Sequence, residues 1–216
     1  MPSLLLALLT LAAPAYAERH GELWLLGGPV FTQGKLSAFT QQTAASPRLG
    51  DSRPFGVGGT AGARLETWAA RWGVGFELAY LDMPVEGGWI KAGTAGALLL
   101  FRPAPGWRWQ PYAGLGPSFY VLEALADYRP PAADRLHKWD AGEWGDPSSL
   151  TFDLRLGVKG RLRGRLLALL EGRVTYLPLD ESWTPGGFLG PPQRHRVGLS
   201  AEAVPLALQA GLGWEF

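Results

Sequence analysis

Apolar and polar residues alternate along much of this chain with a period of two. From Leu206 to Phe216, apolar side chains occupy every second position, with small or polar residues between them. Residues 150–161 show the same alternation, with leucines and Phe152 set against aspartate, arginine and lysine. A period of two is that of a β-strand with one face in an apolar medium and the other against small or polar groups. The pattern therefore predicts β-strands with one apolar face.

Eight such runs predict eight strands, although the first is less regular and the faces of the fourth are not assigned by the pattern. The connections between them are, in order, long, short, medium, short, long, short and long. An up-and-down barrel with both chain ends on the side of the short turns has connections of this kind, and in bacterial outer membranes that side is the periplasm. Closure leaves no unpaired backbone groups in lipid. The predicted strands are 22–31, 58–68, 73–81, 91–102, 110–122, 150–161, 166–177 and 206–216, and the long loops are 32–56, 123–149 and 178–204.

The first residues have the composition of an export signal. Residues 1–17 contain a short apolar stretch followed by Ala15 and Ala17, the small residues that a signal peptidase reads, although no lysine or arginine precedes the apolar stretch. The sequence thus predicts a cleavable signal peptide over 1–17 and a single barrel domain over 18–216.

One segment in the middle of the chain, Trp109-Gln110-Pro111-Tyr112-Ala113-Gly114-Leu115-Gly116, resembles the entry into a middle strand of small outer-membrane β-barrel proteins of the opacity-protein-like type. The ending Trp214-Glu215-Phe216 resembles their closing strand. The resemblance implies an all-β fold, an eight-stranded antiparallel up-and-down transmembrane β-barrel, in the outer membrane of a Gram-negative-type bacterium. It also implies that Trp214 and Phe216 form a C-terminal insertion signal. The partners expected are outer-membrane lipids, the barrel-insertion machinery and an external ligand of the loops, and we expect a monomer.

Strand parity places charged residues on the inward face. Four cationic and five anionic side chains nearly cancel there, and the interior of an eight-stranded barrel is just wide enough for side chains to fill it. We therefore expect a plugged interior in which the charges pair; a narrow porin-like channel is the alternative. The residues of this predicted network are Arg64, Glu66, Glu77, Asp153, Arg155, Lys159, Glu171, Arg173 and Glu215.

Aromatic residues gather near both ends of the predicted strands, as in the interfacial girdles of membrane barrels. Trp68, Trp72, Trp107 and Trp109 lie near short turns, and Tyr80 and Trp89 lie toward the long loops. We expect all six to be interfacial.

Composition and spacing argue against several other functions. The 20 lysine and arginine residues are balanced by 19 acidic ones, so no net charge favours a nucleic acid, and the chain has no cysteine. His195 and Ser200 are five residues apart and would point to opposite faces of a strand, which does not suit a catalytic pair. His137, near Asp134 and Asp140, is a loop residue, and we expect no metal, no cofactor and no enzyme activity. A lipid A-modifying enzyme and a periplasmic lipocalin-like carrier remain less favoured alternatives.

Overall fold

The computed structural model describes residues 19–41, 49–86, 88–128, 137–140, 148–183 and 196–216. The predicted signal peptide, 1–17, lies outside them. Within the described part of the chain, no helix is long and apolar enough to cross a membrane.

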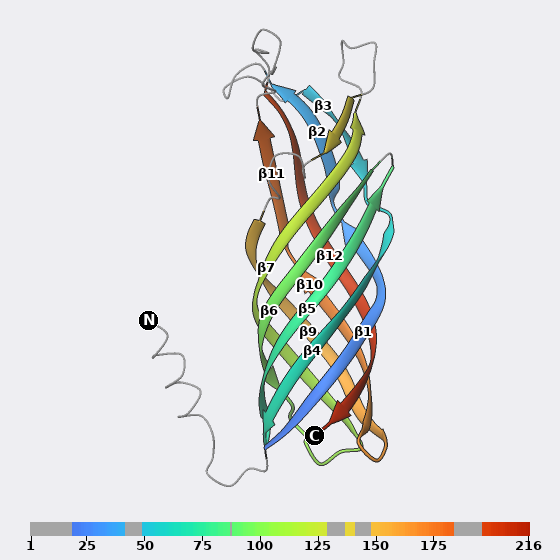
Figure 1. The fold of residues 1–216 in the computed structure, drawn as a ribbon, viewed down its shortest axis with the longest axis vertical. Helices are drawn as coiled ribbons and strands as arrows, with labels where there is room; N and C mark the ends of the chain where they lie inside the picture. Colours follow the sequence, from blue (N-terminus) through green and yellow to red (C-terminus); the bar gives the residue numbers. More distant parts are fainter. Residues whose placement is uncertain (1–18, 42–48, 87, 129–136, 141–147, 184–195) are drawn as a thin grey trace, which may run out of the picture.

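Eight antiparallel strands form a closed barrel (Figure 1). Each strand pairs with its neighbours in the sheet, and the first and last strands pair from Glu22–Glu215 to Gln33–Val204, which closes the cylinder. The predicted fold class, an eight-stranded antiparallel barrel, is confirmed. In the order around the barrel, its strands are β1 (Arg19–Gln33), β4 (Val57–Ala69), β5 (Trp72–Val85), β6 (Gly88–Phe101), β7 (Trp109–Tyr128), β9 (Ser148–Arg163), β10 (Leu166–Thr175) and β12 (Arg196–Glu215).

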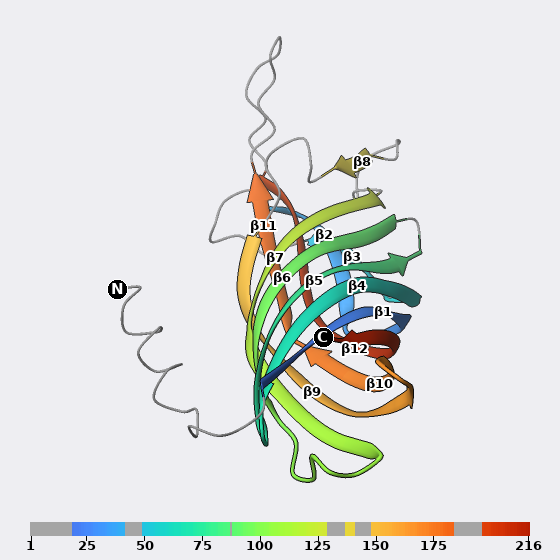
Figure 2. The same cartoon turned by 60° about the horizontal axis from the view of Figure 1, so that its bottom comes forward.

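Short turns close one end of the barrel, which is called the lower end below. Residues 70–71 join β4 to β5, and residues 164–165 join β9 to β10. Both turns need a left-handed backbone: Gly164 has φ 58°, which glycine adopts freely, and Ala70 has φ 53°. The segment 102–108 joins β6 to β7 at the same end, where Phe216 also lies (Figures 1 and 2).

Paired strands rise beyond the barrel at the opposite, upper end, where the sequence predicted long loops. β2 (Lys35–Gln41) and β3 (Leu49–Pro54) form a hairpin within 32–56, and β2 pairs with the first part of β12. β11 (Leu177–Trp183) pairs with the other edge of β12, and β8 (His137–Asp140) pairs with the end of β7. The prediction of three loops was thus wrong in part, because strands outside the bilayer need no apolar face and leave no alternation to read.

The outer surface of the barrel is a belt of exposed apolar side chains. From residue 150 to residue 156 of β9, even positions are exposed and the residues between them are buried, as expected for strands whose successive side chains point to opposite faces. A contiguous apolar belt of this extent is a surface for lipid rather than for water. Members of the belt include Leu25, Leu65, Phe76, Leu78, Leu115, Phe119, Phe152, Leu154, Leu156, Leu170, Leu208 and Leu212.

The interior has two zones that differ in chemistry. Toward the upper end, apolar side chains from several strands form one buried cluster that includes Leu81, Met83, Ile90 and Leu122. Toward the lower end, the interior contains ionised side chains, packed among Trp24 and Trp68. The charged zone is the part of the molecule that differs most from an ordinary hydrophobic core, so it is the candidate site.

Candidate functional site

Of the cationic side chains that are buried in the described part of the chain, four lie on barrel strands. Arg64 on β4, Arg155 and Lys159 on β9, and Arg173 on β10 are all at most 3% exposed. Each occupies one of the alternate strand positions that point inward, and the positions of the same strand that point outward carry apolar residues. Burying a charge is costly unless it is paired and hydrogen-bonded, so the partners of these four groups decide what the interior can do.

Glu77 on β5 is the point where two of the arginines meet. Arg155 donates to both carboxylate oxygens of Glu77, from Nη1 to Oε2 at 2.5 Å and from Nη2 to Oε1 at 3.0 Å. Arg173 donates from Nη1 to Oε1 at 3.1 Å. Two parallel N–H···O bonds from one guanidinium are the strongest arrangement for such a pair. Since β5 lies across the barrel from β9 and β10, these bonds cross the lumen.

Glu171 on β10 forms a second junction. It accepts from Arg64 Nη1 at 2.7 Å and from Arg155 Nη1 at 3.3 Å. The hydroxyl of Tyr112, from β7, also donates to Oε2 of Glu171. Arg64 Nε lies 3.0 Å from Oε1 of Glu66 and 3.7 Å from Oε2 of Glu77. The two junctions therefore share Arg64 and Arg155 and form one network.

Asp153 forms the boundary of the network on the side of the apolar zone. Its carboxylate lies 2.8 Å from Arg173 Nη2 and 3.0 Å from Arg155 Nη2. It also accepts hydrogen bonds from the hydroxyls of Ser118, Tyr120 and Thr175, at 2.7, 2.9 and 2.5 Å. Three neutral donors and two cations satisfy the lone pairs of this buried carboxylate.

Lys159 holds the lower end of the network. Its Nζ lies 2.5 Å from Oε2 of Glu22 and 3.1 Å from Oε2 of Glu66, and 3.9 Å from the centroid of the Trp68 ring. The indole N–H of Trp68 donates to Oε2 of Glu66 at 2.8 Å. Trp24 donates to Oε2 of Glu22 at 3.1 Å. Two tryptophans thus orient the two carboxylates that bind the ammonium group.

Two residues lie elsewhere than the sequence predicted. Trp68, expected at the membrane interface, is fully buried inside the barrel, because it occupies the same inward parity as Arg64 and Glu66. Glu215 has inward parity but lies at the rim, where it pairs with the exposed Arg161 and takes no part in the buried network. The fifth buried carboxylate is that of Glu22 instead, which was not among the residues predicted for the network. In the run 22–31, Gly27-Gly28-Pro29 interrupts the alternation, so the sequence did not indicate which residues point inward. In the structure, Trp24, Leu26 and Val30 are all buried and share a face with Glu22.

The other selected aromatic residues lie outside the lumen. Trp72, Tyr80, Trp107 and Trp109 are exposed, and Trp89 is partly exposed with Lys91 Nζ 4.2 Å from its ring centroid. At the end of the chain, Trp214 is 52% and Phe216 62% exposed.

The backbone of Phe216 pairs with Gly21 in both directions, at 2.9 and 3.0 Å. The side chain of Phe216 therefore projects outward from a ladder that remains paired to its end.

Among the described residues, no group of three or more histidine or acidic side chains is placed to hold a metal ion. His195 lies outside the described residues, so the expectation that His195 and Ser200 point to opposite faces stays a prediction.

Comparison with known proteins adds fold-level similarity. No protein-family model matches the chain, and no curated protein matches it in sequence. The outer membrane protein OprG of Pseudomonas aeruginosa is similar in structure, with a TM-score of 0.52 at 19% identity over 93% of this chain and 98% of OprG. The outer membrane protein AlkL, determined in lipid bilayers, has a TM-score of 0.54 at 16% identity over 95% of this chain and 94% of AlkL. Both solved proteins belong to the outer membrane, the location predicted here from the sequence.

Similarity at this level of identity concerns the fold, and it agrees with the closed sheet and the apolar belt described above. The chain has the fold of the small outer-membrane β-barrel proteins, an eight-stranded antiparallel barrel with an apolar exterior.

Proposed function

We propose that this protein is a non-conducting outer-membrane barrel whose interior is plugged by its own charged side chains, and whose role is structural or surface-interactive through its upper end. The observation that carries the proposal is the network of ion pairs that crosses the lumen between facing strands. In the order around the barrel, β5 and β10 lie four strands apart, which is opposite in a barrel of eight. The bond between Glu77 and Arg173 joins these two walls.

Solvation argues in the same direction. Arg64, Arg155, Glu77 and Glu171 are all at most 2% exposed, so water of a continuous channel does not reach them. An ion that followed the axis would have to break bonds between buried, mutually paired charges, and breaking such a pair leaves an uncompensated charge in a medium of low dielectric constant. The apolar cluster above the network adds a second barrier to ions, because it offers them no polar group.

The upper end supports a role outside the membrane. β2 and β3, β11 and the first part of β12 continue the sheet beyond the barrel, and β8 pairs with β7 there (Figures 1 and 2). Paired strands of this kind make a rigid base on which the segments between them can be presented to an external partner. We infer that the upper end faces the cell exterior and the short turns face the periplasm.

Solute flux tests the plugged interior. Purified, folded protein in liposomes should give no swelling beyond that of empty liposomes with a series of sugars and amino acids of increasing size, whereas a porin of known diameter reconstituted alongside should. Heat-unfolded protein is the blank. Size-dependent swelling in the presence of the folded protein would favour the porin-like alternative instead.

Orientation has a separate test, made simple by the absence of cysteine from the chain. Lys35→Cys places one thiol at the start of β2 at the upper end, and Gly106→Cys places one in the exposed turn at the lower end. A membrane-impermeant maleimide applied to whole cells should label the first variant. It should label the second only after the outer membrane is permeabilised. The reverse pattern would invert the proposed orientation.

A further inference from the structure

We propose that the lower mouth of the barrel binds the phosphate group of a small anionic molecule, with Arg102 as its principal contact. The mouth is a pocket of about 690 Å³, within the range of about 300–1,000 Å³ found for small-molecule sites. It is lined by five cationic side chains and only two carboxylates, those of Glu22 and Glu215. The pocket lies below the plug, so its occupancy does not depend on whether the barrel conducts.

Arg102 is a buried cation without an anionic partner. Its residue is 5% exposed, yet no carboxylate of the described residues lies within ion-pair distance of its guanidinium. Its Nε donates to the carbonyl of Ala70 at 2.8 Å, and its Nη1 donates to Oε1 of Gln110 at 3.0 Å. Within the described part of the chain, Nη2 donates to no group. The side chain packs with its guanidinium carbon 4.6 Å from the centroid of the Trp68 ring.

The histidine beside Arg102 cannot satisfy both of its neighbours. Nε2 of His20 lies 3.2 Å from Oε1 of Glu22 and 3.4 Å from Nη1 of Arg102. A ring nitrogen that donates its proton to Glu22 cannot also accept a proton from Arg102. An acceptor in the pocket would take the N–H groups of Arg102 and leave His20 to donate to Glu22.

The electrostatic environment favours an anion over a neutral guest. Burial lowers the pKa of the Arg102 guanidinium from its usual value, and the more distant carboxylates of Glu22, Glu66 and Glu215 raise it. The two carboxylates that line the mouth already have cationic partners: Glu22 pairs with Lys159, and Glu215 pairs with Arg161. An anion bound at Arg102 would therefore add the missing negative charge.

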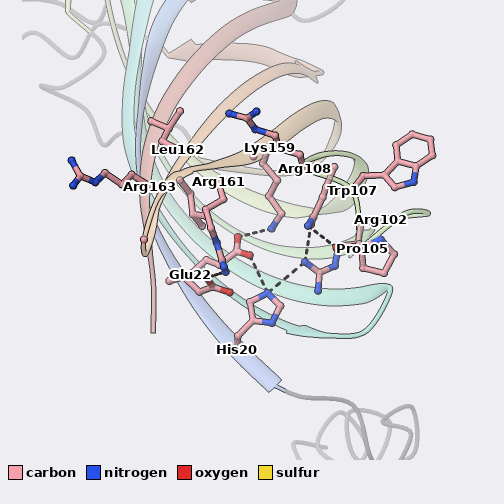
Figure 3. A pocket seen from close by; sticks show the side chains of 16 residues that line it. His20, Glu22, Arg102, Pro105, Trp107, Arg108, Lys159, Arg161, Leu162 and Arg163 are labelled. Carbon is pink, nitrogen blue, oxygen red and sulfur yellow. Dashed lines mark hydrogen bonds and ion pairs between the residues drawn. The ribbon is translucent and has the colours of Figure 1, made fainter.

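The donor set matches phosphate better than a single carboxylate. Figure 3 shows the side chains of Lys159, Glu22, His20 and Arg102 converging inside the mouth, while Trp107 and Arg163 point away from it. A guanidinium binds two oxygens of a phosphate in a fork. A third oxygen would remain for exposed cations of the lining such as Arg108, for which the described residues offer no ion pair. The phosphate could belong to a soluble phosphate ester or to a phospholipid headgroup.

Calorimetric titration of the folded protein in a phosphate-free maltoside detergent tests the site. The probes are inorganic phosphate and glycerol 3-phosphate, with acetate as the carboxylate comparison. Native mass spectrometry of the same sample after addition of phosphatidylglycerol or of an uncharged diacylglycerol examines the lipid source. Arg102→Gln removes the fork, and Arg102→Lys keeps only the charge. Arg165→Gln removes an equal charge from an exposed side chain in the lower turn 164–165, outside the lining of the pocket.

We expect saturable binding of a phosphate probe by the wild type. Arg102→Gln should weaken this binding at least about tenfold, since a charged hydrogen-bonded contact is worth about 1.5–3 kcal/mol. Arg165→Gln should change it less than about twofold. Arg102→Lys should lie between them. Binding of phosphatidylglycerol alone, lost in Arg102→Gln, would assign the phosphate to a lipid. Equal weakening by Arg102→Gln and Arg165→Gln would overturn the proposal. So would the failure of every probe to bind folded wild-type protein, that is, protein whose unheated and boiled samples migrate differently in a denaturing gel.

Discussion

Arg173 of β10 and Glu77 of β5 meet across the lumen, with Nη1 and Oε1 3.1 Å apart. Glu77 also holds both terminal nitrogens of Arg155. One carboxylate thus pairs with two guanidinium groups that come from adjacent strands on the opposite wall. The barrel is held at this level by bonds through its centre as well as by the backbone ladder around it.

Glu77→Ala should destabilise the folded barrel strongly. The substitution leaves Arg155 and Arg173 buried with fewer anionic partners, and removing one member of a buried ion pair costs about 3–5 kcal/mol. Urea titration of the protein reconstituted in vesicles, read by the heat-dependent gel shift and by tryptophan fluorescence, measures the loss.

Arg161→Gln is the matched control for this prediction, because it breaks a charged pair at the rim, where Arg161 is largely exposed. Exposed pairs contribute about 0–1 kcal/mol. An equal loss of stability in the two variants would mean that the central network stabilises the barrel no more than an exposed ion pair does.

Gly116→Ala should prevent β6 and β7 from pairing normally. A Cβ at residue 116 would lie 1.8 Å from the carbonyl oxygen of Ala97, a backbone atom that cannot move aside without shifting a strand. Gly93→Ala serves as control, since a Cβ there meets nothing within 4 Å; it should be neutral, or stabilising by up to about 1 kcal/mol. The yield of heat-shiftable protein after refolding measures both, and normal refolding of Gly116→Ala would show that the strands approach less closely than described.

The strands were predictable where lipid imposes alternation and not where it is absent. β9 alternates because its even residues face an apolar medium and its odd residues face charges, so the run 150–161 identified it from sequence. The hairpin of β2 and β3 lies above the belt, where no such constraint acts, and it was predicted as a loop. The strand β11 within 178–204 was missed for the same reason.

For the interior, the alternation along each strand correctly predicted which side chains point inward. It did not predict how far from the rim of the barrel each of them lies. Trp68 shares its face with Glu66 and therefore lies inside, although its position near a turn suggested the interface. Glu215 shares the inward face as well but lies too near the rim to be buried. The pairing of each carboxylate with a particular guanidinium depends on the register of the strands around the whole barrel. That register cannot be predicted from the alternation in a single sequence.

Arginine substitutions on the outer face should depend on depth. Leu156 is exposed on the outside of β9, well away from its ends, whereas Leu162 is exposed beside the lower turn. A lipid-facing arginine costs about 2–4 kcal/mol at the bilayer midplane and about 0–1 kcal/mol near the interface. Urea titration in vesicles should rank Leu156→Arg as the less stable variant; equal stability of the two would contradict the placement of the belt in lipid.

Phe216→Ala should impair assembly in cells more than refolding in detergent. Its side chain is exposed while its backbone pairs with Gly21, so truncation leaves the ladder intact and removes only the proposed insertion signal. Leu212→Ala, on the same outward face of β12, is the control. Outer-membrane abundance of the two variants, compared with their refolding yields, separates the effects. If Phe216→Ala is assembled as well as Leu212→Ala, the residue is not an insertion signal.

The plugged interior is tested most directly by single-channel recording of the wild-type protein in planar bilayers. The cross-lumen bonds of Glu77 and Glu171 predict no stable openings at moderate voltage in samples that show the heat-dependent shift of a folded barrel. Reproducible unitary conductance that rises with salt concentration, seen in folded wild-type samples and absent after heat unfolding, would mean that ions pass the network and would contradict the account.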